Sequence, residues 1–212
     1  TYKDATVRVT LPLASALSEK KQTTYYKGVA GEELANYAYD WTGVKGAETK
    51  KQTTVYAYNS DDSLLNTTVY KSDAILSVTT AGVITLVALP IKKSMTYYLG
   101  AKGDEVLSFG QTYAQGLPDK TTLYTIVGGI MTQSDTYKDS TVRAALPLAA
   151  ALSEKKQTTY YKGPAGEELA NYAYDWTGVK GSETKKQTTV YSYNTDDSLL
   201  NTTVYKSDAI LS

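Results

Sequence analysis

The residues that most resemble a chemical site are two pairs of adjacent carboxylates. Glu32 with Glu33, and Asp61 with Asp62, are of the kind that general acid–base catalysis uses. Adjacent side chains of a strand point to opposite faces, so we interpret both pairs as solvated turn charges. The chain has no His and no Cys, which removes the common bases, thiol nucleophiles and thiolate ligands. We therefore predict no catalytic, cofactor-binding or metal-binding residue, and we expect that the protein is not an enzyme.

Two loops invite a ligand interpretation. The loop Asn59–Ser63 gathers oxygen atoms of the kind that calcium prefers. Its spacing differs from that of an EF-hand, so a capped hairpin turn is the favoured interpretation and a weak calcium site the alternative. Gly28-x-x-Gly31 is not expected to bind phosphate, because it lies between predicted strands with no helix start to hold an anion.

Sugars are the other ligands to consider. Asn66-Thr67-Thr68 and Asn201-Thr202-Thr203 match the N-glycosylation acceptor pattern, which matters only if the chain is secreted by a cell with that machinery. The chain has 20 Tyr against one Phe and two Trp. Tyr rings near Lys27, Lys71 and Lys138 could stack on glycans or cell-wall polymers. Rings packed on one another within a sheet are the favoured interpretation, and glycan binding is the alternative.

Charge and hydropathy argue against two other partners. Lys plus Arg total 22 and Asp plus Glu total 22, so no net charge draws the chain to nucleic acid. No apolar run approaches the ~20 residues that cross a bilayer, so we expect no membrane span in this segment. The chain begins and ends inside a repeat, and we expect any signal peptide or anchor to lie outside it.

One repeated stretch organises the chain. Residues 24–41 return at 159–176 with Pro164 in place of Val29, and return in diverged form at 96–113. Their shared skeleton is Thr-Tyr-Tyr-x-Gly-x-x-Gly, an acidic residue, Glu and an apolar residue. Such internal repeats indicate a modular architecture.

The repeats divide the chain into units. Residues 1–77 and 136–212 differ at eight positions. We predict a unit A at 1–69, a unit B at 70–136, a second unit A at 137–204 and the start of a further unit B at 205–212.

Each unit is expected to consist of β-hairpins. In unit B, residues 74–79 and 83–89 flank Thr80-Ala81-Gly82 and predict a buried hairpin. The counterpart in unit A is the apolar segment 6–11, followed by an Ala-rich tail. Whether this tail forms a single helical turn, most favoured at Ala149–Ala151, is left open.

The following segments of each unit also predict hairpins. The turn at Gly28–Gly31 precedes an alternation of Tyr37, Tyr39 and Trp41, which favours a strand. Residues 42–51 are interpreted as a polar linker to a second hairpin, with strands at 53–58 and 64–70. Unit B has a strand at 121–124 and a turn at Val127-Gly128-Gly129.

A known pattern appears at Tyr37-Ala38-Tyr39-Asp40-Trp41-Thr42-Gly43 and again at 172–178. It resembles the Tyr-x-Tyr-Asp-x-x-Gly core of the YD (Rhs) repeat, and residues 56–64 resemble the same motif with Asn for Asp. The resemblance covers about half of each unit and lacks the usual Gly-Arg-Leu. It implies β-hairpins that stack into a spiralling sheet, as in bacterial Rhs and toxin-complex shells and in teneurins. The near-identical tandem copies look more like a long bacterial surface-repeat or adhesin-type protein.

The sequence thus predicts an all-β protein of tandem β-hairpin repeats that stack as a solenoid or a spiralling continuous sheet. Each unit of ~67 residues is too small for a strong core of its own, so neighbouring units or identical chains are the expected partners. The favoured function is a structural segment of an extracellular or cell-surface fibre or array. The alternatives are a shell that encloses a cargo and a glycan-binding adhesin module.

The Tyr residues carry a specific expectation. Their rings should contact other rings or neighbouring strands and should not line a ligand pocket; the residues are Tyr37, Tyr39, Tyr56 and Tyr58, with Tyr172, Tyr174, Tyr191 and Tyr193 in the second copy.

Overall fold

A computed structural model describes Thr1 and residues 17–206 of the chain. These residues form fourteen β-strands and one 3-10 turn, η2 (Ala149–Ala151), with no α-helix among them. The all-β prediction is confirmed, and the Ala-rich tail of the second copy does form a short helical turn. The predicted apolar segment 6–11 and most of the further unit B at 205–212 lie outside the described residues.

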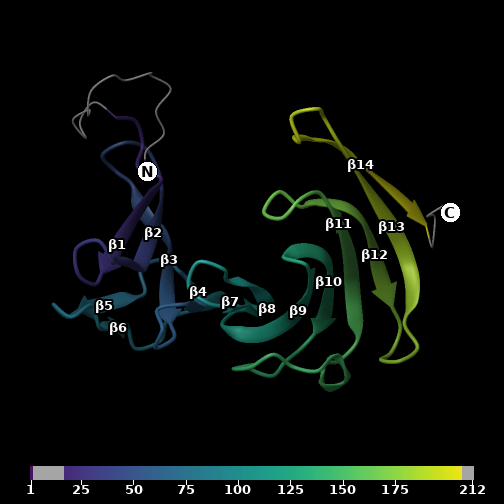
Figure 1. Ribbon diagram of the computed structural model, residues 1–212, viewed down its shortest axis with the longest axis horizontal. Coiled ribbons are helices and arrows are strands. Elements are labelled where there is room, and N and C mark those ends of the chain that lie inside the picture. Colours follow the sequence, from purple (N-terminus) through teal and green to yellow (C-terminus); the bar gives the residue numbers. More distant parts are fainter. Residues whose placement is uncertain (2–16, 207–212) are drawn as a thin grey trace. The chain divides into compact units, whose positions relative to one another are not determined.

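The chain divides into two compact units, Thr1–Met95 and Thr96–Ser212. Within the first, four antiparallel strands follow one another in chain order (Figure 1): β1 (Gln22–Lys27), β2 (Leu34–Thr42), β3 (Thr49–Tyr58) and β4 (Leu64–Lys71). A separate hairpin consists of β5 (Ile75–Val78) and β6 (Ile84–Leu86). Strand β7 (Lys92–Leu99) includes the boundary between the two units.

The second compact unit is a longer meander of the same kind. Its strands are antiparallel neighbours in chain order (Figure 1): β8 (Val106–Ala114), β9 (Leu117–Val127), β10 (Ile130–Lys138), β11 (Lys155–Lys162), β12 (Leu169–Thr177), β13 (Thr184–Tyr193) and β14 (Leu199–Lys206). Strands β11–β14 repeat the sequence and pairing of β1–β4, which is what near-identical sequence dictates.

The register of the strands sorts side chains onto two faces, because directly opposed residues share a face. Tyr39 lies opposite Thr23 and Thr53 on one face, and Thr53 is fully buried. Asp40 points to the other face. There its carboxylate accepts bonds from the side-chain amides of Gln22 at 2.9 Å and Gln52 at 2.6 Å. The Tyr-Asp pair of the motif therefore provides one aromatic contact and one polar bridge.

One turn recurs five times and corrects the interpretation of residues 42–51 as a linker. Strand β2 ends at Thr42 and β3 begins at Thr49, so residues 43–48 form a hairpin turn and the remainder of the segment belongs to the two strands. All five turns have the pattern Gly-x-x-Gly-x-Glu and start at Gly28, Gly43, Gly100, Gly163 and Gly178. The first Gly has φ between 110° and 122°, a region that favours glycine. The Glu carboxylate then accepts the N–H of the second Gly at 2.8–3.0 Å.

The other turns follow the sequence predictions. Asp61 accepts the backbone N–H of Ser63 at 3.1 Å and its hydroxyl at 2.6 Å, so the loop Asn59–Ser63 is a capped turn. Gly128 and Gly129 have φ of 60° and 79°, as a two-residue hairpin turn between β9 and β10 requires.

The hairpin predicted at 74–89 forms, but it is not buried. Leu76 is 67% exposed and Leu89 is 90% exposed. Only Ala74 is fully covered there, with its N–H donated to the Thr53 hydroxyl at 3.1 Å. Apolar composition misled the prediction, because the hairpin meets β2 through the tip of its turn at Gly82 and not through a whole face.

Candidate functional site: the aromatic ladder and the adjoining pocket

The most distinctive group of side chains is a row of rings that we name the aromatic ladder, consisting of Tyr25, Tyr37, Tyr39 and Trp41. Tyr25 stacks on Tyr37 with ring centroids 4.5 Å apart and an interplanar angle of 13°. Tyr39 meets Tyr37 at 5.4 Å and Trp41 at 5.9 Å, both edge to face. Offset stacked and edge-to-face pairs are the geometries in which aromatic rings attract one another.

The second copy reproduces this ladder in Tyr160, Tyr172, Tyr174 and Trp176. The stacked pair lies at 4.6 Å, and the two edge-to-face contacts lie at 5.5 and 6.1 Å. Trp176 donates its indole N–H to the Thr158 hydroxyl at 3.0 Å, as Trp41 does to Thr23 at 3.1 Å. Each indole is therefore satisfied within its own sheet.

A Lys–Asp pair borders the first ladder. The Lys50 ammonium lies 3.8 Å from the centroid of the Tyr39 ring and 2.5 Å from the Asp73 carboxylate. Burial raises the pKa of Tyr39, and the neighbouring Asp73 also raises it, whereas Lys50 acts against this shift. Lys185 lies at the same distance, 3.8 Å, from Tyr174 in the second copy. The cation lies over a ring that is 6% exposed in Tyr39 and 8% exposed in Tyr174, which leaves little ring surface for a ligand.

Other tyrosines bond to neighbouring strands. Tyr58 donates its hydroxyl to the Ala35 carbonyl at 2.8 Å, and Tyr193 does the same to Ala170 at 2.8 Å. Tyr191 lies near Tyr193, Tyr161 and Asp175, and burial first and then these groups raise its pKa. The expected contacts with rings or strands are therefore present for Tyr37, Tyr39 and Tyr58, and they are repeated in their counterparts Tyr172, Tyr174 and Tyr193.

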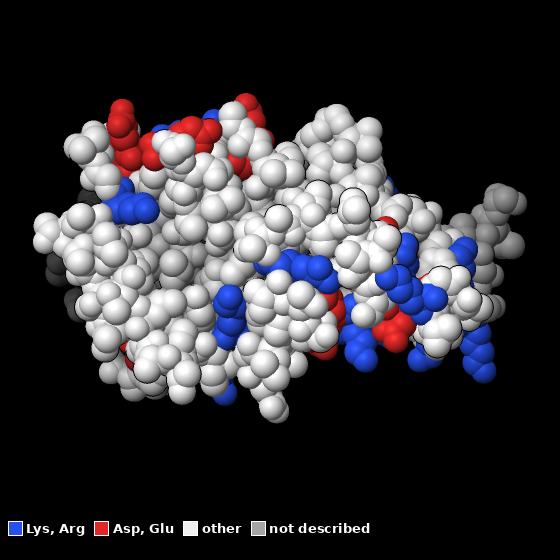
Figure 2. All heavy atoms as spheres, turned by 90° about the horizontal axis from the view of Figure 1, so that it is seen from below, with Lys and Arg blue, Asp and Glu red and all other residues white. Residues whose placement is uncertain are grey.

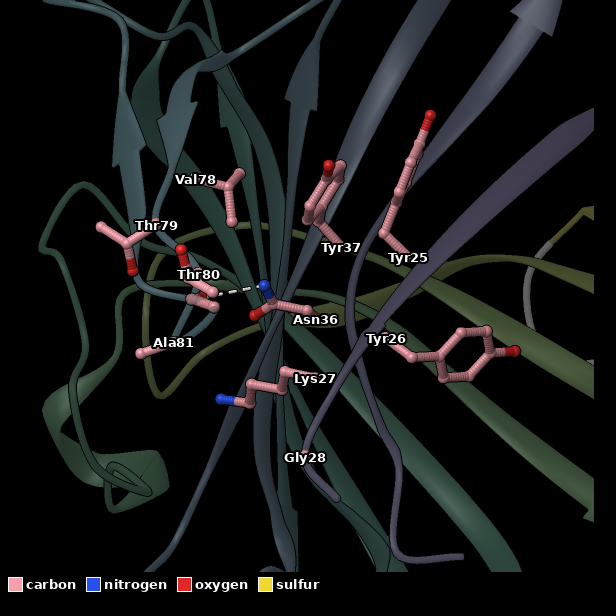
Figure 3. Close-up of a pocket in the computed structure, with 11 residues that line it drawn as sticks. Tyr25, Tyr26, Lys27, Gly28, Asn36, Tyr37, Val78, Thr79, Thr80 and Ala81 are labelled. Carbon is pink, nitrogen blue, oxygen red and sulfur yellow. Dashed lines mark hydrogen bonds between the residues drawn. The ribbon is translucent and has the colours of Figure 1, made fainter. Parts of the chain in front are cut away.

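One ladder residue departs from the expectation. Tyr37, with Tyr25, lines a pocket of about 450 Å³ between β1–β2 and the β5–β6 turn. Figure 3 shows the two rings side by side at its wall, with Val78 and Thr80 from the β5–β6 hairpin close by. Asn36 closes one side and donates its amide to the Gly82 carbonyl at 2.9 Å. Ring faces beside hydroxyl and amide groups are suited to a polyhydroxylated ligand.

Unit B replaces the third ladder ring with an amide. Tyr97 stacks on Phe109 at 4.4 Å, as Tyr25 does on Tyr37, but Gln111 holds the position of Tyr39. Gln111 is 1% exposed and donates to the Thr121 hydroxyl at 3.1 Å and the Thr141 carbonyl at 2.7 Å.

This buried network centres on Asp139. The Asp139 carboxylate, 3% exposed, accepts from Thr121 at 2.7 Å and from the Arg143 guanidinium at 2.8 and 3.0 Å. Burial alone would raise the pKa of Asp139, but the Arg143 and Thr121 bonds outweigh it and lower the pKa. The network was not predicted from the sequence; the only local signal for it is Gln111 at the position of a ladder Tyr.

The glycosylation motifs lie on strands. Asn66 is on β4 opposite Ala57 and is half-buried, and Thr68 of the same motif is 6% exposed. Asn201 on β14 is exposed. The two copies of the motif therefore differ in accessibility.

Charged groups form no single-sign surface on the face shown in Figure 2, where acidic groups lie beside several of the basic ones. Within Thr1 and residues 17–206, no helix has the length and apolar character needed to span a bilayer. No group of three or more potential metal ligands occurs in the same part of the chain.

The ladders thus use their rings mainly within the sheet. One pocket is lined by Tyr25 and Tyr37 of the first ladder, and another of about 320 Å³ is lined by Trp176 of the second. The chain matches no protein-family model and no curated protein.

Proposed function

We propose that the chain is a structural segment of a long extracellular fibre or cell-surface array built from tandem β units that stack as a solenoid or spiralling sheet. The observation that carries the proposal is the recurrence of one internal geometry. Both ladders have the same ring contacts, the same indole bond and the same Lys over the third ring. Aromatic rings that pack within the sheet in both A copies are expected of a structural protein built from repeated units.

The turns support contacts between neighbouring hairpins. Glu168, in the turn after β11, accepts the N–H of Met131 on β10 at 2.9 Å. Glu48 and Glu183 accept the N–H of Lys20 at 3.1 Å and of Lys155 at 3.0 Å in the same way. Each of these carboxylates joins its own turn to the chain of the preceding hairpin. The Glu168 bond links the predicted second unit A to unit B, whereas the Glu48 and Glu183 bonds lie within a unit A.

The extracellular or cell-surface location is part of the proposal. It draws on the resemblance of the Tyr-x-Tyr-Asp-x-x-Gly motif to YD repeats and on the near-identity of the two A copies.

A second candidate, glycan binding, is favoured by one observation. Tyr25 is 41% exposed and lies beside the pocket that Asn36 and Thr80 also line. A saccharide could stack on that ring and bond to the polar groups around it.

Tandem polypeptides with one, two and three A–B pairs test the structural proposal. In a one-dimensional array, interfaces add with each unit, so the midpoint of thermal unfolding should rise with the number of pairs. The maximum dimension measured by small-angle X-ray scattering should grow in proportion. A dimension that levels off would favour a closed shell. Pairs that melt independently of their number would contradict the proposal.

A further inference from the structure

Strands β1 and β11 have the same sequence but different surroundings. Residues 20–27 and 155–162 are both Lys-Lys-Gln-Thr-Thr-Tyr-Tyr-Lys. Strand β11 pairs with β10 on one side and β12 on the other, whereas β1 pairs with β2, and among the described residues only Thr1 bonds to its other side. Tyr26 is 64% exposed, whereas its counterpart Tyr161 is half-buried. The outer edge of β1 is therefore the same surface that β10 covers on β11.

The β10–β11 junction shows which contacts that surface makes. Lys155 donates its ammonium to Asp135 at 2.8 Å, and the Thr158 hydroxyl donates to the same carboxylate at 2.5 Å. The hydroxyls of Ser134 and Tyr161 lie 3.1 Å apart. Glu168 completes the junction through its bond from the Met131 N–H.

Every receiving group of that junction has a counterpart on β1 or in the residues directly before and after it. The counterparts of Lys155, Thr158, Tyr161 and Glu168 are Lys20, Thr23, Tyr26 and Glu33. One oxygen of Glu33 accepts the Gly31 N–H, and the structure gives its other oxygen no partner among the described residues. A surface pocket lies at Tyr26 and Glu33, where the incoming strand would run.

Thr1 sets the register. It bonds to both the N–H and the carbonyl of Gln22, at 3.1 and 2.6 Å. Thr136 lies opposite Gln157 in the β10–β11 pairing, and these residues are the counterparts of Thr1 and Gln22. A residue of an incoming strand that lies directly before Thr1 would therefore take the place that Asp135 has before Thr136. A carboxylate there would lie within reach of Lys20, as Asp135 does of Lys155.

We propose that the outer edge of β1 is a docking site for a strand with the sequence of β10, supplied by another unit B and paired antiparallel in the β10–β11 register. The inference rests on the proposed structural function and names the partner of that function. Charge complementarity selects this occupant: the end strand β14 of a second copy has Thr203 where β10 has Asp135, so it offers Lys20 no carboxylate.

A β9–β10 peptide added to the full chain tests the proposal. The peptide contains residues 117–135 and stops at Asp135 because Thr1 already occupies the next position. We expect it to bind with one-to-one stoichiometry in titration calorimetry. In NMR spectra, the bound peptide should slow the solvent exchange of the Tyr26 amide hydrogen. A peptide with Asp135→Thr should bind more weakly by about fivefold, the loss of a charge-assisted bond.

Variants of the chain provide matched controls. Glu33→Gln should weaken peptide binding about fivefold, because Gln offers one acceptor oxygen where Glu33 would need two. Glu168→Gln, the same change in the second copy, should leave peptide binding unchanged because β10 already covers that site.

Several results would overturn the inference. The first is that the peptide does not bind, or that a scrambled peptide binds with the same affinity. The second is that Glu33→Gln and Glu168→Gln change peptide affinity equally. The third is that the chain forms dimers that the peptide does not dissociate. The tandem-polypeptide series separates the two claims: a length-dependent rise in the unfolding midpoint without peptide binding refutes this docking register alone. Peptide binding without that rise refutes the structural function.

Discussion

The Tyr39→Ser variant is expected to lose about 3–5 kcal/mol of unfolding free energy, the usual cost of removing a large buried aromatic side chain. Tyr39 is 6% exposed and touches Tyr25, Tyr37 and Trp41. Adding Tyr37→Ser should extend the loss by a smaller amount, because Tyr37 is only half-buried. Urea unfolding of the full chain, followed by circular dichroism, measures the change.

The second copy offers the matched control. Tyr174 is 8% exposed and has the same ring partners, so Tyr174→Ser should destabilise the second compact unit to a similar extent. Glu32→Ala, an exposed change in the turn after β1, should have little effect. Saccharide binding is measured on the same samples. Unchanged unfolding with lost saccharide binding would make the ladder a binding surface and refute its structural role.

Asp139→Ala is the second change with a large expected effect, about 3 kcal/mol of unfolding free energy. It leaves the Arg143 guanidinium and the hydroxyl of buried Thr121 without their carboxylate partner. Asp104→Ala, an exposed turn residue, is the control. Equal stability of the two variants in urea would contradict the proposed role of the network.

We also expect Asp139 to make the free energy of unfolding depend on pH. The pKa of Asp139 is lowered in the folded state, so its contribution is present above the unfolded pKa and is lost as pH falls through the folded pKa. Acid titration of the unfolding free energy should therefore show a smaller decrease for Asp139→Asn than for the unmodified chain.

Local signals in the sequence predicted most of the hairpins. Alternating Tyr37, Tyr39 and Trp41 indicated β2, and Gly128-Gly129 indicated the β9–β10 turn. These features depend on neighbours in sequence, which a single chain displays directly.

Features that depend on distant residues could not be predicted in the same way. The bond from Lys20 to Glu48 spans 28 residues, and the bond from Asn36 to Gly82 spans 46. The interpretation of residues 42–51 as a linker overlooked that Gly43-x-x-Gly46-x-Glu48 repeats the pattern of Gly28-x-x-Gly31-x-Glu33. The exposure of the β5–β6 hairpin likewise depends on what lies beside it, and apolar composition alone does not contain that information.

Amide hydrogen exchange measures directly whether neighbouring strands supply the stability of each repeat. Residues 22–27 and 157–162 have the same sequence, so chemical exchange differs little between them and any difference in rate reports their neighbours. Peptic fragments that extend to Val29 or Pro164 distinguish the two strands by mass. We expect β1 to exchange at least about tenfold faster than β11. Equal exchange of β1 and β11 would contradict it.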